Sequence, residues 1–254
     1  MLIVVALGGN ALLQRGEPLE ADLQRKNVKE TALAIAELAK DHKVIICHGN
    51  GPQVGLLALQ SDCYKKVKPY PLDILVAESQ GMIGYLIQQE IDNQLSHKSV
   101  ATLLTQVVVN KKDPAFNDPS KPIGPVYDKE QAKKIAAERG WQVSPDGEYF
   151  RRVVPSPEPE EIVELQTVKA LLDLGLVVIC GGGGGIPVVR ENKHTLVGVE
   201  AVIDKDNTAS LIAEKLDADS LLIVTDVDGV YVDWGTPNAK KIKSVTPSTL
   251  KKMD

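Results

Sequence analysis

The chain has 254 residues, a net charge of −5 and an apolar fraction of 43%. That length is enough for one large domain or two small ones with a sizeable buried core. This negative net charge does not indicate a basic surface that would bind nucleic acid. Any anion-binding site therefore has to be a local cluster of lysines and backbone N–H groups. No apolar run approaches the length of a signal peptide or a membrane span. We therefore expect a cytoplasmic protein that binds neither nucleic acid nor membranes.

The three cysteines, Cys47, Cys63 and Cys180, form no C-x-x-C pair. Cys47 and Cys180 each end an apolar run, which favours buried free thiols and fits a reducing cytoplasm. No His, Cys or carboxylate cluster has metal-ligand spacing, so the sequence predicts no metal site of the protein's own.

The first half of the chain alternates apolar runs with amphipathic stretches. Buried strands are predicted at residues 2–7 and 44–47, and each one ends at a glycine-rich turn. Helices are predicted at about residues 20–41 and 72–95, and residues 100–109 read as a strand. We then interpret residues 110–127, which are rich in Pro, Lys, Asp and Gly, as an excursion from the core.

The second half repeats the rhythm of strand, glycine turn and helix. A short helix near 128–139 and an exposed strand at 149–154 lead into a helix at about 160–174. Strands at 176–180 and 220–224 then flank a helix at about 207–216. This order predicts βαβ units, a mainly parallel sheet and helices on both of its faces. Ligands bind beyond the carboxyl ends of such strands, where every glycine-rich segment of this chain falls.

Gly8-Gly9-Asn10 follows the first strand and suits phosphate binding through backbone N–H groups, although an ordinary tight turn fits equally well. His48 opens a second glycine-rich turn, at 48–55. The spacing of its glycines suggests a dinucleotide-binding site. Such a site also requires a strand that ends in an acidic residue about 20 residues later, and the sequence has no such strand. His48 is either a base or a residue that hydrogen-bonds the turn.

Five consecutive glycines, at 181–185, cost backbone entropy, so we expect a ligand or another segment to approach the main chain there. A flexible linker fits less well because buried strands flank the run. Asp204-Lys205-Asp206 begins a helix, and Lys205 is suited to neutralise a transferring phosphoryl group. Helix capping by either carboxylate is the alternative. The sequence has no P-loop and no protein-kinase motif set, so magnesium is expected to arrive with a nucleotide.

Together these segments resemble the amino acid kinase superfamily and, within it, the carbamate kinase family. The similar blocks occur in the family's order and cover nearly the whole chain. They are residues 4–11, 48–55, 104–109, 121–125, 153–157, 182–189 and 198–206.

The resemblance implies a three-layer α/β/α sandwich over residues 1–254 with a mainly parallel sheet, a protruding subdomain at 110–153, and a homodimer. It implies an ATP-dependent phosphotransferase with a carboxyl-type acceptor, converting ATP and carbamate to ADP and carbamoyl phosphate. The reverse direction would make ATP in arginine and nitrogen catabolism. A kinase for another small acid, or an inactive nucleotide-binding member, is the alternative.

The resemblance also assigns roles to residues. Lys121 would reach the phosphoryl group from the protruding subdomain, Lys205 would contact the nucleotide phosphates, and Asp206 would organise the lysines. The residues that would hold carbamate and the phosphoryl group are Gly8, Gly9, Asn10, Gly49, Asn50 and Gly51. The residues that would contact ATP or ADP are Gly181, Gly182, Gly183, Lys205, Thr225, Asp226, Val227 and Tyr231.

Two positions depart from wider patterns. Many superfamily members have a lysine where this chain has Ala6, and carbamate kinases share its absence, with Lys121 thought to compensate. Members of the carbamate kinase family also continue beyond the point that corresponds to Asp254. The continuation includes a phosphate-contacting lysine, so we expect the C-terminal part of the family domain to be absent after residue 254.

Overall fold

The computed structural model describes residues 1–254 apart from residues 15, 226, 228 and 251–254, and apart from the side chain of Asn10. The chain divides into two compact units, Met1–Val224 and Thr225–Asp254, which are described separately.

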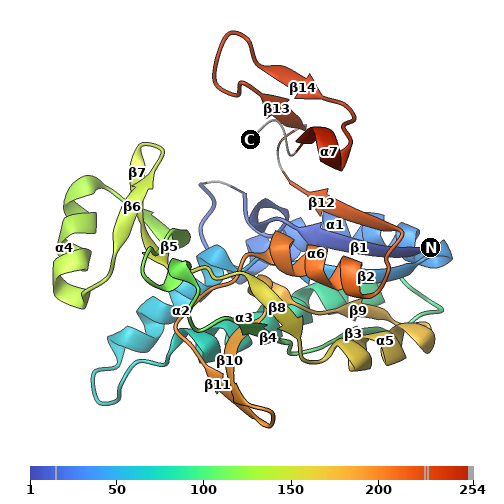
Figure 1. The fold of residues 1–254 in the computed structure, drawn as a ribbon, viewed down its shortest axis with the longest axis horizontal. Helices are drawn as coiled ribbons and strands as arrows, with labels where there is room; N and C mark the ends of the chain where they lie inside the picture. The colour runs from blue at the N-terminus through green and yellow to red at the C-terminus, as the bar shows by residue number, and fades with distance from the viewer. Residues whose placement is uncertain (15, 226, 228, 251–254) are drawn as a thin grey trace. The chain divides into compact units, whose positions relative to one another are not determined.

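A five-stranded parallel sheet forms the centre of the first unit. Its strand order is β12-β1-β2-β9-β3, and Figure 1 shows the strands in this order, from β12 at the top to β3 below. The strands are β1 (Leu2–Leu7), β2 (Lys43–His48), β3 (Val100–Thr102), β9 (Val177–Ile179) and β12 (Ser220–Val224). The sequence places β1, β2, β9 and β12 within a few residues, because each is a short apolar run ended by a turn.

Alternate residues of β1 face two different helix layers. Ile3 and Val5 pack with α1 (Ala21–Asp41) and α3 (Leu72–Asp92). Val4 and Ala6 pack instead with α5 (Leu165–Asp173) and α6 (Lys205–Lys215). Both faces of the sheet are therefore buried at β1, which explains its unbroken apolar sequence. The predicted three-layer sandwich with a mainly parallel sheet is confirmed.

A second sheet corrects two sequence predictions. Its order is β11-β10-β4-β8, formed by β4 (Gln106–Val109), β8 (Pro159–Ile162), β10 (Ile186–Asn192) and β11 (Thr195–Gly198). Residues 100–109 are thus two strands in different sheets, because the Gln80 side chain binds both backbone groups of Thr105 and separates them. The helix predicted at 160–174 begins only at Leu165, since Pro159–Ile162 pairs with β4.

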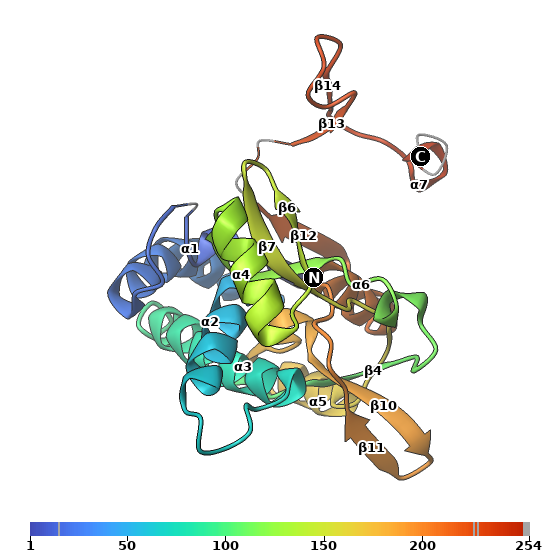
Figure 2. The ribbon, with the colours of Figure 1, turned by 90° about the vertical axis from the view of Figure 1, so that its left-hand side faces the viewer.

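A small sheet with one helix lies outside these layers and is called the β5–β7–β6 subdomain. It contains β5 (Lys121–Tyr127), α4 (Lys129–Arg139), β6 (Val143–Asp146) and β7 (Tyr149–Val154). Asp128 begins α4 with a capping box that includes Gln131. Figures 1 and 2 show α4 and the β6–β7 hairpin projecting beyond α2 (Gly51–Cys63).

Two glycines form the closest backbone contact described between the subdomain and the rest of the unit. A Cβ added to Gly55 of α2 would lie 1.9 Å from the Cα of Gly124 in β5, and Gly124 has a φ of +76°. Gly55 has no room for a side chain, and the positive φ of Gly124 favours glycine there. This contact sets how closely β5, and with it Lys121, approaches α2.

The second unit is small. It contains a hairpin of β13 (Val230–Val232) and β14 (Lys240–Ile242), followed by α7 (Pro247–Leu250). The rings of Tyr231 and Trp234 lie 5.0 Å apart within it.

The cysteines are free, and Cys47 and Cys180 are buried as predicted. A hydrogen bond with Cys47, together with burial, raises the pKa of the Cys180 thiol. None of the helices in the described part of the chain has the length and apolar character needed to cross a membrane.

Candidate active site

A cavity of about 270 Å³ lies at the carboxyl ends of the parallel strands. Three glycine-rich segments end there: η1 (Gly9–Ala11) after β1, the 49–51 turn after β2, and η3 (Gly182–Gly184) after β9. The rest of the cavity lining comes from β5, β7 and the start of α6. The lining residues are Gly9, Gly49, Asn50, Gly51, Pro52, Lys121, Pro122, Arg151, Gly183, Ile203, Asp204, Lys205 and Asp206.

Lys121 enters this cavity from β5 and forms an ion pair with Asp204. Burial alone would raise the pKa of Asp204, but the hydrogen bond and charge of Lys121 outweigh it, helped by the N–H groups of Asp206 and Asn207. The pKa of the Asp204 carboxyl is lowered as a result. Lys121 is therefore held in the cavity as an ammonium group beside an ionised carboxylate.

Lys205 supplies a second ammonium group at the first turn of α6. Its Nζ lies 2.7 Å from Oδ1 of Asp206, and only 14% of its side chain is exposed. Asp204 is the N-cap of the same helix and accepts a hydrogen bond from the Asp206 N–H at 2.8 Å. Asp204 therefore caps the helix, and Lys205 lines the cavity.

The glycine turns bring backbone close to the lysines. A Cβ added at Gly49 would lie 3.4 Å from the Gly9 N and 3.6 Å from the Cδ of Lys205. The buried side chain of Asn50 donates a hydrogen bond of 2.8 Å to Oγ of Ser79 in α3. The floor of the cavity is thus mostly main chain held by side chains from below, which suits an anion.

The five-glycine run is fixed by a buried polar network. Gln80 donates to the Gly182 O, Thr208 donates to the Gly184 O, and the Gly181 N–H donates to Oγ1 of Thr105. Gly183 has a φ of +64°, and a Cβ there would lie 2.2 Å from Nδ2 of Asn50. The segment is therefore ordered and closely packed, which rules out the flexible-linker interpretation.

His48 is fully buried between two of the turns. Its Nδ1 lies 2.9 Å from the Gly49 O, and a Cβ on Gly182 would lie 2.3 Å from its Nε2. Burial lowers the pKa of His48 to about 4, although the backbone hydrogen bond opposes the shift. His48 is therefore neutral near pH 7 and binds the turn.

This burial makes a pH-dependent stability. Between pH 6.5 and 4 the unfolded His48 gains a proton that the folded residue does not, so stability falls as the pH drops. We expect His48→Gln to remove about 3 kcal/mol of that fall, measured by urea unfolding at several pH values. His194→Gln, at an exposed histidine, is the control. An unchanged slope in His48→Gln would contradict the assignment.

The structure brings together most of the residues singled out from the sequence. Gly8 adjoins the cavity through Gly9, while Gly181 and Gly182 are buried and do not line it. Thr225, Val227 and Tyr231 belong to the second unit, which is described by itself. Asp226 and the side chain of Asn10 lie outside the described residues.

Two residues were missed by the sequence analysis. Asp204 was considered only as a cap, yet it is the partner of Lys121. Arg151 lines the cavity and donates to the Gly124 O through Nε at 3.1 Å and Nη2 at 2.8 Å. The period of two in a strand would have put Arg151 and Arg152 on opposite faces, but it does not say which one faces the site.

The amino acid kinase family model matches residues 1–254, and the chain belongs to this family. Its relatives are carbamate kinases. The chain is 54% identical to the carbamate kinase of Haemophilus influenzae over all of this chain and 82% of that protein. It is 52% identical to the carbamate kinase of Escherichia coli K12 over 98% of this chain and 82% of that protein.

Solved structures agree. Carbamate kinase from Giardia lamblia bound to citric acid superposes with a TM-score of 0.88 at 44% identity, covering 92% of this chain and 77% of that one. The same enzyme bound to AMP-PNP gives a TM-score of 0.82 at 44% identity, covering 95% of this chain and 78% of that one.

Proposed function

We propose that this protein is a carbamate kinase, which transfers a phosphoryl group reversibly between ATP and carbamate. The observation that supports this most directly is the single cavity face that presents Lys121 and Lys205, each beside a carboxylate, above glycine backbone. An acceptor in this cavity has to be small, since the glycine turns leave about 270 Å³.

The chemistry needs little from the protein beyond position and charge. In the ATP-forming direction, a terminal phosphate oxygen of ADP attacks the phosphorus of carbamoyl phosphate, and the bond to the carbamoyl oxygen breaks. Carbamate leaves as an anion with the bonding electrons, so no general base is required. The charge on the transferring group is what has to be stabilised, and two ammonium groups do this.

The ion pairs place both lysines before substrate arrives. Phosphoryl oxygens would compete with Asp204 for Lys121 and with Asp206 for Lys205, so the carboxylates act as positioning residues. Backbone N–H groups at Gly9, and the turn at 49–51, would hold carbamate and the phosphoryl group. Magnesium would enter with the nucleotide as part of the substrate, with most of its ligands from phosphates and water.

The nucleotide site is proposed at the five-glycine run and Lys205. Residues 110–153 are proposed as the protruding subdomain that carries Lys121. A homodimer is supported by Ile74, Met82 and Tyr85, exposed apolar residues spaced along one side of α3. We also propose a cytoplasmic location and a role in arginine or nitrogen catabolism.

The test is ATP formation from ADP, magnesium and carbamoyl phosphate. We expect turnover at enzymatic rates with carbamoyl phosphate and none with acetyl phosphate or acetylglutamyl phosphate. Nucleotide binding without ATP formation would favour the inactive nucleotide-binding alternative. Preference for another acyl phosphate would favour a kinase for another small acid.

Lys121→Ala is expected to lower kcat about a hundredfold, because one of the two cations near the transferring group is lost. Stability should change little, since the side chain is at the surface of the cavity and its loss frees Asp204 to meet solvent. Lys133→Ala on α4, whose side chain is 64% exposed, is the control for the same subdomain. Equal rates for Lys121→Ala and the control would remove Lys121 from the mechanism.

A further inference from the structure

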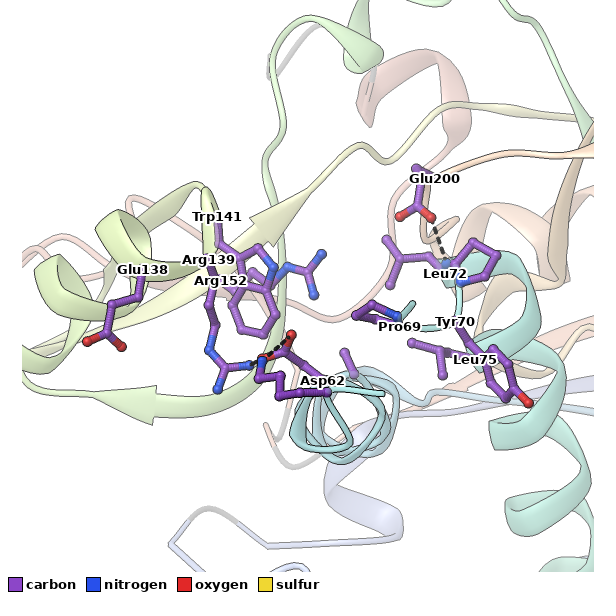
Figure 3. Close-up of a pocket in the computed structure, with 13 residues that line it drawn as sticks. Asp62, Pro69, Tyr70, Leu72, Leu75, Glu138, Arg139, Trp141, Arg152 and Glu200 are labelled. Carbon is purple, nitrogen blue, oxygen red and sulfur yellow. Dashed lines mark hydrogen bonds and ion pairs between the residues drawn. The ribbon is translucent and has the colours of Figure 1, made fainter. Parts of the chain in front are cut away.

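A second cavity, of about 410 Å³, lies between the β5–β7–β6 subdomain and the connection of α2 to α3. Its volume is in the range of small-molecule pockets. Its residues differ entirely from those of the active-site cavity. Figure 3 shows Arg139, Trp141 and Arg152 on the subdomain side, facing Asp62, Leu72 and Glu200 on the other.

Arg152 is the unusual group in this cavity. Its Cζ lies 4.0 Å from the centre of the Trp141 ring, and burial lowers its pKa. Among the described residues, nothing accepts a hydrogen bond from its guanidinium and no carboxylate lies within ion-pair distance. A partly buried guanidinium without a hydrogen-bond acceptor is costly, because N–H donors that lose water gain no partner in exchange.

Two neighbouring carboxylates already have hydrogen-bond partners of their own, although the charge of Glu200 opposes the lowering of the Arg152 pKa by burial. Asp62 is shared by Arg139 and Lys65, which hold its pKa below the usual range. Glu200 accepts a hydrogen bond of 3.1 Å from the Leu72 N–H, so it caps α3. Arg152 is thus a planar cation on the Trp141 ring, and none of the described side chains forms a hydrogen bond or a close ion pair with it.

Part of the remaining wall is apolar, although Lys65 and Glu138 also line the cavity. Leu72 and Leu75 form this apolar part together with Pro69 and Pro71. A guanidinium fork matches the two oxygens of a carboxylate, and the leucines match a hydrocarbon chain. Free phosphate would bind the guanidinium but would make no apolar contact with the leucines.

We propose that this cavity binds a small aliphatic carboxylate, with its oxygens on Arg152 and its chain against Leu72 and Leu75. The occupied cavity would join the subdomain to the α2–α3 connection. Arg152 pairs with Ile123 across the β5–β7 ladder, two residues from Lys121. A carboxylate bound in this cavity therefore also influences the position of Lys121. We expect its binding to lower the KM for carbamoyl phosphate.

Binding is measured by the fluorescence of Trp141 with butyrate as the probe. The chain has two tryptophans, so Trp234→Phe leaves Trp141 as the single reporter. We expect a saturable change with butyrate, weakened about tenfold or more in Arg152→Gln and partly retained in Arg152→Lys. Arg190→Gln, at an arginine on β10, is the matched control and should bind normally. Circular dichroism confirms that each variant is folded.

Two further probes decide the chemistry. Butyramide has the same shape without the charge, and inorganic phosphate has charge without the chain. An equal response to butyramide, equal or tighter binding of phosphate, or butyrate binding unchanged in Arg152→Gln would overturn the proposal. So would the absence of any saturable change.

The effect on Lys121 rests on the proposed function and has its own readout. We expect butyrate to lower the KM for carbamoyl phosphate in the wild type and to leave it unchanged in Arg152→Gln. Butyrate that binds without changing this KM would overturn the link to Lys121. Fluorescence requires no catalysis, so failure of the site and failure of the proposed function are distinguishable.

Discussion

Lys205→Ala is expected to lower kcat for ATP formation about a thousandfold, the largest effect of any single side chain in the cavity. Its side chain is 14% exposed and stands at the first turn of α6, with Nζ 2.7 Å from Oδ1 of Asp206. In so confined a place a charge acts through little water, and no other cation lines that wall except Lys121 and Arg151, which come from the subdomain. Steady-state kinetics with ADP and carbamoyl phosphate provide the measurement.

Lys215→Ala is the control, because Lys215 lies in the last turn of the same helix and its side chain is 49% exposed. It should keep the wild-type rate. Lys205→Arg retains charge but not the compact ammonium, and we expect it to recover only part of the activity. A Lys205→Ala enzyme within about threefold of the wild type would show that the charge at this position does not stabilise the transition state.

Gly55→Ala is expected to destabilise the protein by about 3 kcal/mol and to lower activity as well. The new methyl group would stand 1.9 Å from the Cα of Gly124, so α2 and β5 have to separate. Lys121 lies on the same strand, and its ammonium would move away from the glycine turns. Urea unfolding gives the free energy, and the ATP-forming assay gives the rate.

Gly81→Ala provides the matched comparison. Gly81 also lies in a helix, but no atom is within 4 Å of the added methyl group. Alanine favours the helix, so we expect this variant to gain about 1 kcal/mol. If Gly55→Ala were as stable as Gly81→Ala, the result would contradict the close contact between α2 and β5.

The sequence predicted most of the strands because a strand buried on both faces is a continuous apolar run. The runs at 2–7, 44–47 and 176–180 are of this kind, and each gives a strand of the central sheet. The run at 220–224 is equally apolar, but it forms the edge strand β12, where Leu222, Ile223 and Val224 are exposed. The division of residues 100–109 was not predictable in this way. It depends on the Gln80 side chain, which reaches Thr105 from a helix that is distant in sequence.

The site shows the same limit. Glycine turns and the Lys205 segment could be located from the chain alone, because parallel strands gather their carboxyl ends at one edge. The pairing of Lys121 with Asp204 joins residues 83 positions apart. Only the paired strands of the subdomain and the packing of Gly55 on Gly124 bring them together, and local patterns carry no information about such a contact.

The crowding of Gly183 against Asn50 has a consequence for how this protein can change. Every substitution at Gly183 adds atoms where the Asn50 side chain already lies, so the floor of the cavity tolerates almost no substitution at this position. New acceptor preferences would have to arise on the opposite wall, at β5 and β7, where side chains rather than main chain meet the cavity. A mutagenesis library for altered specificity is therefore best directed at Pro122 and Arg151 rather than at the glycine turns.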